Sequence, residues 1–335
     1  MKRLLIVIII ASSLHLLSLP IHAQVKKVEA IGFTVRDMDR SVRFYSEVLH
    51  FKKISDTESA GTEYEKLYGV FGLRIRVVQM QLGDETIELT DYLTSGGRTI
   101  PEDQQSNDLI FQHIAIVVSD MEKAYQHLRR FTIDHVSTAP QTLPKSIPAA
   151  EGIKAFYFRD PDQHNLELIY FPKGKGLDKW QQPSGKIFLG IDHTAIGIGN
   201  TERSHQFYQQ LLGLERKGDS WNKGSEQEHL NNIKGASLHI TGYRSNAGPG
   251  IEFLEYLSPG PGKPYPADSK ASDLWHWQTS LIVSDASSLL AKLKQAAYHI
   301  ISDDIVTTTS EKGRKTKSFL VRDPDGHAVL IKEEE

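Results

Sequence analysis

The sequence contains no cysteine among its 335 residues. This absence excludes disulfide bonds, thiol nucleophiles, cysteine-containing metal sites and a lipid-modified N-terminal cysteine. An excess of positive charge is also missing, because 39 Lys and Arg stand against 42 Asp and Glu, for a formal net charge of −3. Such a chain lacks the basic surface that nucleic-acid binding requires. We therefore expect no nucleic-acid partner, and any metal site must use His, Glu, Asp or Gln.

Long apolar runs are confined to the N-terminus. Lys2 and Arg3 precede an apolar stretch from Leu4 to Leu19, and the small residue Ala23 follows. A positive start, an apolar middle and a small-residue end are typical of a secretory signal. An uncleaved anchor is the alternative, but the run is short for a span of about 20 residues. We expect a signal peptide at 1–23 and a secreted or periplasmic mature protein without membrane association.

The remaining chain repeats itself. Asp39–Tyr45 recurs as Glu202–Tyr208, and Phe158–Asp162 recurs as Val321–Asp325, in both cases 163 residues further on (202 − 39 and 321 − 158). Repetition at a fixed offset indicates two fused copies of one construction. We predict two domains, at 27–172 and 188–333, joined by a linker at 173–187.

Each half divides again into two similar modules. Ile31–Val35 alternates between apolar and smaller residues, as a half-buried strand does. Asp37 is a suitable cap for the helix that follows, and further strands are predicted at 74–82 and 86–89. The same order recurs from His113 to Tyr170. A strand, a helix and further strands, four times over, predict an α+β protein.

Several of these segments resemble one family. Val35–Ser41, followed by Phe44 and Tyr45, resembles the first quarter of the vicinal oxygen chelate superfamily, which includes glyoxalase I, extradiol dioxygenases and bleomycin-resistance proteins. Thr86–Thr90 resembles its fourth strand and Gln112–Ala115 its fifth, and the resemblance covers nearly all of the mature chain. It implies four βαβββ modules that form two glyoxalase-like domains. The fold alone does not identify the reaction, because it hosts many chemistries.

The resemblance also implies metal ligands. In the family two modules close into a cup with four possible metal positions, and the first domain supplies Glu88, His113 and Glu167, with Ala30 at the remaining position. Two Glu and one His suit a divalent metal such as Zn, Ni, Co, Mn or Fe. Two carboxylates that converge in an apolar cup repel each other and lose hydration, so a cation must neutralise them or one must bind a proton.

The second domain carries a different set. It supplies His193, Glu252 and Gln278, while the last position falls on Leu330. Gln is a weak neutral ligand and the final carboxylate is missing, so we expect the metal in the first domain. The second cup is then expected to bind an organic ligand or only to support the first.

The reaction that the resemblance implies is a glyoxalase-like lyase, isomerase or epimerase acting on a small oxygen-rich carbonyl substrate. A metal polarises adjacent oxygens and lowers the pKa of the neighbouring C–H, and Glu167 or Glu88 would serve as the base. Ring-cleaving dioxygenases need two His and one carboxylate on one face, which neither domain supplies. A dioxygenase with an atypical site remains an alternative.

Two functions without catalysis are also compatible with the sequence. The first is a binding protein that sequesters a small molecule without metal, which ligand binding indifferent to a chelator would indicate. The second is a protein–protein module with two vestigial cups, which large side chains filling both cups would indicate. The sequence is compatible with a monomer or a homodimer, and with modules that pair within one chain or between two.

Overall fold

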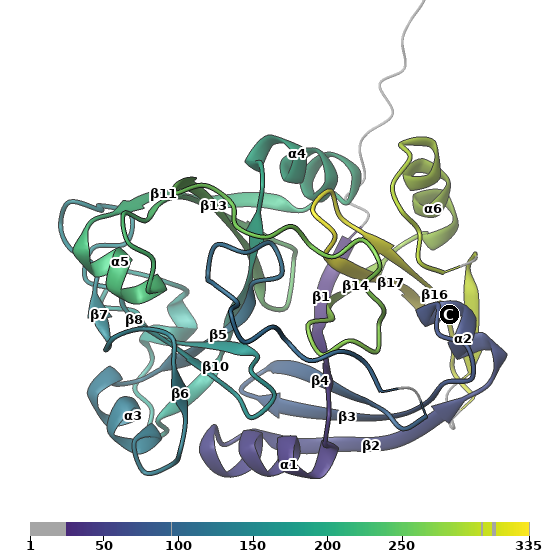
Figure 1. Ribbon diagram of the computed structural model, residues 1–335, viewed down its shortest axis with the longest axis horizontal. Helices are drawn as coiled ribbons and strands as arrows, with labels where there is room; N and C mark the ends of the chain where they lie inside the picture. Colours follow the sequence, from purple (N-terminus) through teal and green to yellow (C-terminus); the bar gives the residue numbers. More distant parts are fainter. Residues whose placement is uncertain (1–24, 95, 303, 310–312, 335) are drawn as a thin grey trace, which may run out of the picture.

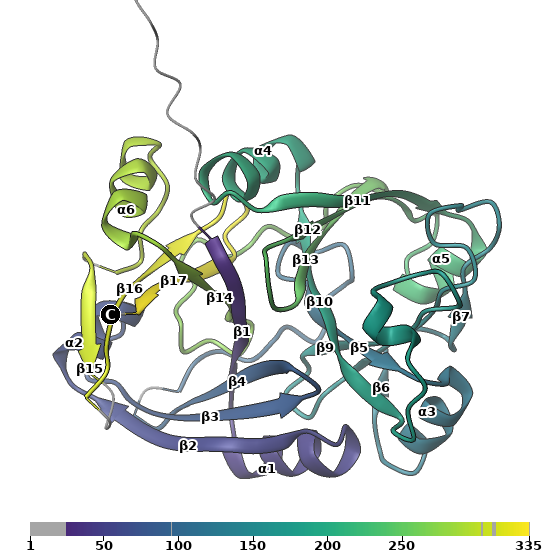
Figure 2. The ribbon, with the colours of Figure 1, turned by 180° about the vertical axis from the view of Figure 1, so that it is seen from behind.

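The structure, a computed structural model, describes residues 25–94, 96–302, 304–309 and 313–334. These residues form two curled β-sheets, of 8 and 9 strands, accompanied by short helices (Figures 1 and 2). This confirms the predicted α+β class. The expected signal peptide at 1–23 lies outside the described residues. Within the described ranges, no helix combines the length and the apolar character needed to cross a membrane.

Four consecutive stretches of chain, called quarters below, build the sheets. Quarter 1 contains β1 (Val25–Val35), α1 (Met38–Arg43), η1 (Phe44–Val48), β2 (Lys52–Ala60), α2 (Thr62–Tyr68), β3 (Arg74–Leu82) and β4 (Glu85–Tyr92). Quarter 2 contains β5 (Gln112–Val118), α3 (Met121–Leu128), β6 (Asp134–His135), β7 (Gln141–Thr142), β8 (Lys154–Arg159) and β9 (Asn165–Tyr170). After the short helix η2 (Asp178–Gln181), quarter 3 contains β10 (Phe188–Ile198), α4 (Thr201–His205), η3 (Gln206–Leu211), β11 (Glu215–Lys223), α5 (Ser225–Asn231), β12 (Ser237–Arg244) and β13 (Gly250–Ser258). Quarter 4 contains β14 (Trp277–Val283), α6 (Ala286–Gln295), β15 (Val306–Thr309), β16 (Lys315–Arg322) and β17 (Ala328–Glu334).

Local sequence explains how each quarter begins. In β1, Ile31 and Phe33 belong to the main apolar core, while the alternate positions point to the other face of the sheet. The side chain of Asp37 accepts a hydrogen bond from the backbone N–H of Arg40 and so caps α1, as predicted. The corresponding helices of the other quarters are capped in the same way by Asp120, Asn200 and Asp285.

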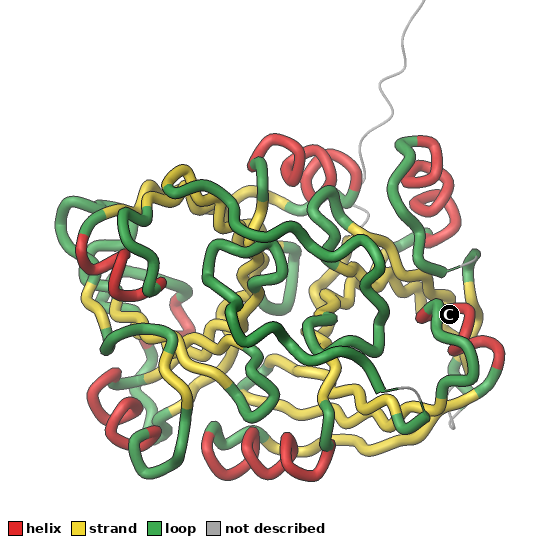
Figure 3. The backbone as a smooth tube through the Cα atoms, viewed as in Figure 1, coloured by secondary structure: helices red, strands yellow, loops and turns green. Residues whose placement is uncertain are grey.

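The sheets do not follow the halves of the sequence. Sheet A has the strand order β15-β16-β17-β14-β1-β4-β3-β2. Sheet B has the order β11-β12-β13-β10-β5-β9-β8-β6, and its ninth strand, β7, pairs with β8 outside this order. Sheet A therefore combines quarters 1 and 4, and sheet B combines quarters 2 and 3. At the centre of each sheet two first strands pair antiparallel, β1 with β14 and β5 with β10. Figure 3 shows the strands as two separate groups, with most of the helices toward the periphery.

The expectation that each half closes a cup of its own is corrected by this strand order. The halves at 27–172 and 188–333 are repeats of the sequence, and each gives one quarter to each sheet. The physical reason is that all four quarters carry the same alternation of apolar residues. That alternation fixes which face of a strand is buried, but not which first strand it pairs with.

Buried polar contacts join the two quarters of each half across the two sheets. The hydroxyl of Tyr45 donates to the Oδ2 atom of Asp160 at 3.0 Å, and Nδ1 of His164 lies 2.9 Å from the same oxygen. The second half repeats this arrangement with Tyr208, Asp323 and His327. His164 and His327, in the hairpin turns, are thus structural residues of the interface between the sheets.

Candidate metal centre

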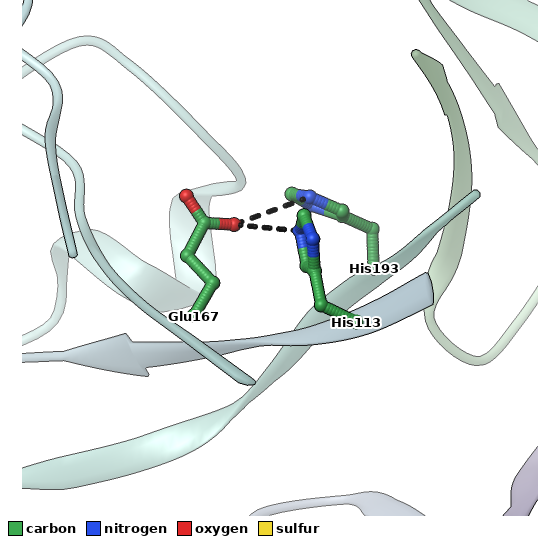
Figure 4. Close-up of side chains that lie close together, drawn as sticks. All are labelled: His113, Glu167 and His193. Atoms are coloured by element: carbon green, nitrogen blue, oxygen red, sulfur yellow. Dashed lines mark hydrogen bonds and ion pairs between the residues drawn. The ribbon is translucent and has the colours of Figure 1, made fainter. Parts of the chain in front are cut away.

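Four side chains with metal-binding chemistry come together in sheet B, each from a different strand. His113 lies on β5, Glu167 on β9, His193 on β10 and Glu252 on β13. The Oε2 atom of Glu167 lies 3.1 Å from Nε2 of His113 and 3.7 Å from Nε2 of His193. Nε2 of His193 also lies 3.4 Å from Oε2 of Glu252. Figure 4 shows the convergence of the first three residues, whose donor atoms all lie within 4.8 Å of one another.

Strand register explains why these side chains meet. Ala115 on β5 lies opposite His193 on the antiparallel β10 and beside Glu167 on the parallel β9. Side chains that are in register on neighbouring strands share one face of the sheet. The same arrangement recurs around Ala195, which lies between the other His and the other Glu. Each central position is a small Ala, which leaves space between the donors.

The donors are enclosed. His113, Glu167 and His193 are almost completely buried, whereas the side chain of Glu252 is 29% exposed. Nδ1 of His113 and Nε2 of His193 have no hydrogen-bond partner among the described residues. Buried polar atoms are normally satisfied, so an unpaired imidazole nitrogen beside two carboxylates indicates a missing partner. Two His and two Glu form a donor set that a divalent cation would satisfy.

A bulge places a further carboxylate behind His193. The register of β10 against β5 shifts between Ile191 and His193, so Asp192 is the additional residue of the bulge. Nδ1 of His193 lies 3.0 Å from Oδ2 of Asp192, which also accepts a hydrogen bond of 2.7 Å from Nη2 of Arg244. Nε1 of Trp180 donates to the other oxygen of this carboxylate at 2.7 Å. The Asp192 carboxylate thereby holds the ring with Nε2 facing the two glutamates.

Electrostatics in the cluster favours a cation. Burial would lower the pKa of His193, but Glu252, Asp192 and Glu167 outweigh it and raise the pKa to about 9. Burial would raise the pKa of Asp192, whereas His193 and Arg244 lower it to about 2. Burial raises the pKa of Glu252; His193 lowers it and Glu167 raises it further, so the pKa stays above its ordinary value. Without a metal, a proton on His193 supplies part of the positive charge that the carboxylates require.

Aromatic and aliphatic side chains close the cup around the donors. The ring of Tyr157 lies 4.8 Å from the ring of His113, and burial together with Glu167 raises the pKa of its phenol well above the ordinary value. Helix α5 covers this face, because Leu230 packs into the same apolar cluster as Tyr157. The hydroxyl of Ser137 donates a 2.7 Å hydrogen bond to the backbone carbonyl of Leu230 and fastens the helix to quarter 2. His113 and Glu167 are therefore shielded from bulk water, while Glu252 stays partly exposed.

Sheet A carries the equivalent positions with different residues. Gly32 on β1 lies opposite Gln278 on β14 and beside Glu88 on β4, and Ser280 on β14 lies opposite Ala30 and beside Leu330. Two of the four positions that hold metal donors in sheet B are thus Ala30 and Leu330. The Oε2 atom of Glu88 accepts a hydrogen bond of 3.3 Å from the amide of Gln79. Sheet A offers one carboxylate and one amide, which is no counterpart to the donor set of sheet B.

The structure regroups the residues that the sequence predicted. His113 and Glu167 of the predicted first set lie together, but Glu88 lies in sheet A. His193 and Glu252 of the second set join His113 and Glu167, whereas Gln278 lies in sheet A with Glu88. The two predicted sets are regrouped because β5 pairs with β10, which brings quarters 2 and 3 into one sheet. A metal role for Glu88, and its role as a base, find no support in this geometry.

Sequence reasoning also missed the residues that support the cluster. Asp192, Trp180 and Arg244 were given no role. Asp192 was passed over because a residue next to a ligand on a regular strand points to the opposite face, and Trp180 and Arg244 act through Asp192. The bulge at Asp192 departs from that rule, and no sequence pattern predicts the bulge. For the grouping of the four donors, one sequence signal was present, because only the two middle quarters carry both a His on the first strand and a Glu on the last.

Fold and donors together define a class of protein, in which two curled sheets each form a cup from paired quarters and one cup holds a His/Glu/His/Glu set. The family model of the Glyoxalase/Bleomycin resistance protein/Dioxygenase superfamily matches residues 27–168 and 190–331. The chain belongs to this superfamily.

Individual relatives agree with the family assignment. The chain is 25% identical to glyoxalase I of Saccharomyces cerevisiae over 197 residues, which cover 54% of this chain and 55% of the yeast protein. It is 30% identical to a 2-epi-5-epi-valiolone epimerase of an Actinomyces species over 159 residues, or 45% of this chain and 83% of that protein. The crystal structure of glyoxalase I from Zea mays superposes with a TM-score of 0.59 at 16% identity and covers 92% of each chain, which shows a shared fold.

Proposed function

We propose that this chain is a metal-dependent lyase, isomerase or epimerase of glyoxalase type that acts on a small oxygen-rich carbonyl substrate. The observation that carries the proposal is the convergence of two His and two Glu from equivalent strands of quarters 2 and 3. The similarity to a glyoxalase I and to an epimerase supports the same class of reaction. The proposal moves the metal from the predicted first domain to sheet B, which both halves build.

His113, Glu167, His193 and Glu252 are the residues that would hold the ion. Their mixed nitrogen and carboxylate donors suit Zn, Ni, Co, Mn or Fe. A divalent ion bound there supplies Lewis-acid polarisation of adjacent substrate oxygens, which lowers the pKa of the neighbouring C–H.

Glu252 is the residue best suited to move a proton. Its side chain is 29% exposed, whereas Glu167 is held between two imidazoles in the interior. Burial raises the pKa of Glu252, and a carboxylate with a raised pKa is a stronger base than one in water. Glu167, which the sequence also suggested as the base, would instead position the two His rings. Tyr157 and helix α5 would limit the access of water to the inner side of the site.

An iron-dependent dioxygenase is the second candidate, and one observation favours it. The sequence argument that no cup contains two His and one carboxylate is wrong, because His113, His193 and Glu167 form such a group. A dioxygenase site needs open positions for oxygen and substrate around the iron. Glu252, as a fourth donor 3.4 Å from His193, occupies space that such a site would keep open. We therefore rank the isomerase reaction first.

We also propose that the chain is exported, on the basis of the segment 1–23. The test is the N-terminal sequence of protein purified from the culture medium or the periplasm of an expressing bacterium. A mature N-terminus directly after Ala23 is expected, and full-length protein in the cytoplasm would contradict export.

The reaction itself is tested by proton exchange. Metal-loaded protein is incubated in deuterated buffer with a panel of small 2-hydroxy aldehydes and ketones, and the loss of C–H signals is followed by NMR. We expect exchange or interconversion for at least one compound, reduced about 10²- to 10⁴-fold in Glu252→Gln. Glu88→Gln is the matched control and should retain the wild-type rate. An absence of exchange across the panel, or an equal rate in Glu252→Gln, would contradict the proposal, and oxygen consumption with catechols and iron would favour the dioxygenase.

A further inference from the structure

We propose that the inner face of sheet A is a second, metal-independent binding site for a small, uncharged polyhydroxylated molecule, such as a cyclic polyol or a monosaccharide. The proposal concerns the cup that lacks the metal donors and is separate from the reaction proposed for sheet B.

The space exists. A cavity of about 280 Å³ lies between strands from both ends of sheet A, so the sheet curls around it. That volume is at the small end of the range for ligand sites and suits a compact molecule. Its wall is rich in hydroxyl groups, from Ser55, Thr57, Ser59, Thr308, Thr316 and Ser318. Hydroxyl groups both donate and accept hydrogen bonds, which matches a ligand that does the same.

Glu88 is the anchor of the site. Its side chain lines the cavity although the residue is only 9% exposed. Across adjacent strands, the hydroxyl of Ser55 donates to Oε1 of Gln79 at 3.3 Å, and Nε2 of Gln79 donates to Oε2 of Glu88 at 3.3 Å. A carboxylate accepts about four hydrogen bonds, and within the described part of the chain Gln79 supplies Glu88 with one long bond, which leaves most of its capacity free. Ligand hydroxyl groups would fill that capacity.

The charge balance favours a neutral ligand. Lys332 lines the cavity, and its Nζ atom lies 2.7 Å from Oε2 of Glu29. Burial would lower the pKa of Lys332, but Glu88 and Glu29 raise it, so the ammonium group stays charged. The charged residues that line the cavity are Glu88 and Lys332, one of each sign, and a ligand with net charge would upset this balance.

A comparison with sheet B shows that four of these polar side chains are particular to sheet A. Ser55 pairs with Gln79 where sheet B pairs Gly218 with Gly242, and Ser318 pairs with Lys332 where sheet B pairs Ala155 with Ile169. The cup without metal donors therefore carries hydrogen-bonding side chains at four positions that are glycine or apolar in the other.

The test is calorimetric titration of the full chain, treated with EDTA, with myo-inositol and with D-glucose. We expect saturable binding of at least one of them, with a dissociation constant of about 1 mM, that is unchanged when metal is restored. Glu88→Gln should weaken it about ten-fold or more, because one acceptor oxygen becomes a donor and the other loses its charge. Glu252→Gln, the matched variant in the other cup, should leave it unchanged. Circular dichroism checks that each variant is folded.

Two outcomes overturn the proposal. One is the absence of saturable binding of either compound up to about 100 mM. The other is binding that Glu252→Gln abolishes and Glu88→Gln preserves, since that places the ligand in sheet B. If Glu88→Gln fails to fold, Ser318→Ala is tested in its place. This substitution removes only the serine hydroxyl group. Unchanged affinity in Ser318→Ala would then count against the site.

Discussion

The Nε2 atom of His193 lies 3.7 Å from the Oε2 atom of Glu167, although the two residues belong to different halves of the chain. Each half contributes one His and one Glu to the cup of sheet B. Quarters 1 and 4 form the cup of sheet A, which lacks this set of two His and two Glu. Fusion of the two repeats therefore concentrates four donors in one place instead of dividing them between two. The remaining cup carries different side chains, such as Gln79 and Lys332.

Metal content should separate the two cups. Sheet B holds the four donors His113, Glu167, His193 and Glu252, and sheet A has no equivalent set. We therefore expect about one divalent ion per chain. Glu167→Gln should reduce this stoichiometry strongly, since an inner carboxylate of the site loses its charge. Elemental analysis by mass spectrometry after dialysis is the measurement. Glu88→Gln is the control and should keep its ion; loss of metal in this variant as well as in Glu167→Gln would restore the grouping that the sequence suggested.

Asp192 should act through His193 and not as a ligand. In Asp192→Asn the amide can still accept a hydrogen bond from Nδ1 of His193, but the negative charge behind the ring is gone. Removal of such a supporting carboxylate typically lowers metal affinity 10- to 100-fold. Competition with a fluorescent chelator measures the affinity. The stoichiometry at saturating metal should remain about one, and an affinity equal to that of the wild type would show that the bulge has no role in the site.

The sequence predicted the fold class and named the candidate metal donors. His113, Glu167, His193 and Glu252 all stood among the candidates that the family resemblance implied, and strand alternation agreed with their sharing faces with small residues. Their grouping was missed, since the pairing of β5 with β10 is a long-range choice between quarters with the same apolar pattern. Only the joint occurrence of His and Glu in the two middle quarters pointed to it. The role of Asp192 was missed for another reason, because a bulge is a local departure from the alternation on which the prediction relied.

The glycines of sheet B should matter for access to Glu252. Gly218 and Gly242 lie where sheet A has Ser55 and Gln79, and a Cβ atom added to Gly242 would lie 3.9 Å from the nearest backbone atom, which is ordinary contact. Gly242→Gln should therefore fold and place an amide beside Glu252, as Gln79 lies beside Glu88.

We expect this variant to lose activity about ten-fold or more, because the amide competes for the carboxylate and fills the space of the substrate. Steady-state kinetics and metal analysis on the same preparation are the measurements. Gly242→Ala is the matched control and should retain most of the activity. Wild-type kcat/KM in Gly242→Gln would show that the space above Glu252 is not used by the substrate.

The buried pair of His164 and Asp160 should make stability depend on pH. Burial would lower the pKa of His164, but Asp160 outweighs it and the pKa is raised above the ordinary value. A histidine with a higher pKa in the folded protein stabilises it fully below the unfolded pKa of about 6.5, and this contribution is lost as the pH rises through the folded pKa. In His164→Gln we expect a loss of about 1–3 kcal/mol at pH 6, the range for a buried hydrogen bond to a charged group.

The difference in melting temperature between the wild type and His164→Gln should accordingly be widest near pH 6 and narrow toward alkaline pH. Differential scanning calorimetry over this range measures it. The equivalent His327 beside Asp323 has a pKa raised in the same direction, so His327→Gln should give a curve of the same sign. The two losses should add in the double variant, because the pairs share no partner. A difference in melting temperature that increases with pH would mean that the histidines are neutral in the folded protein.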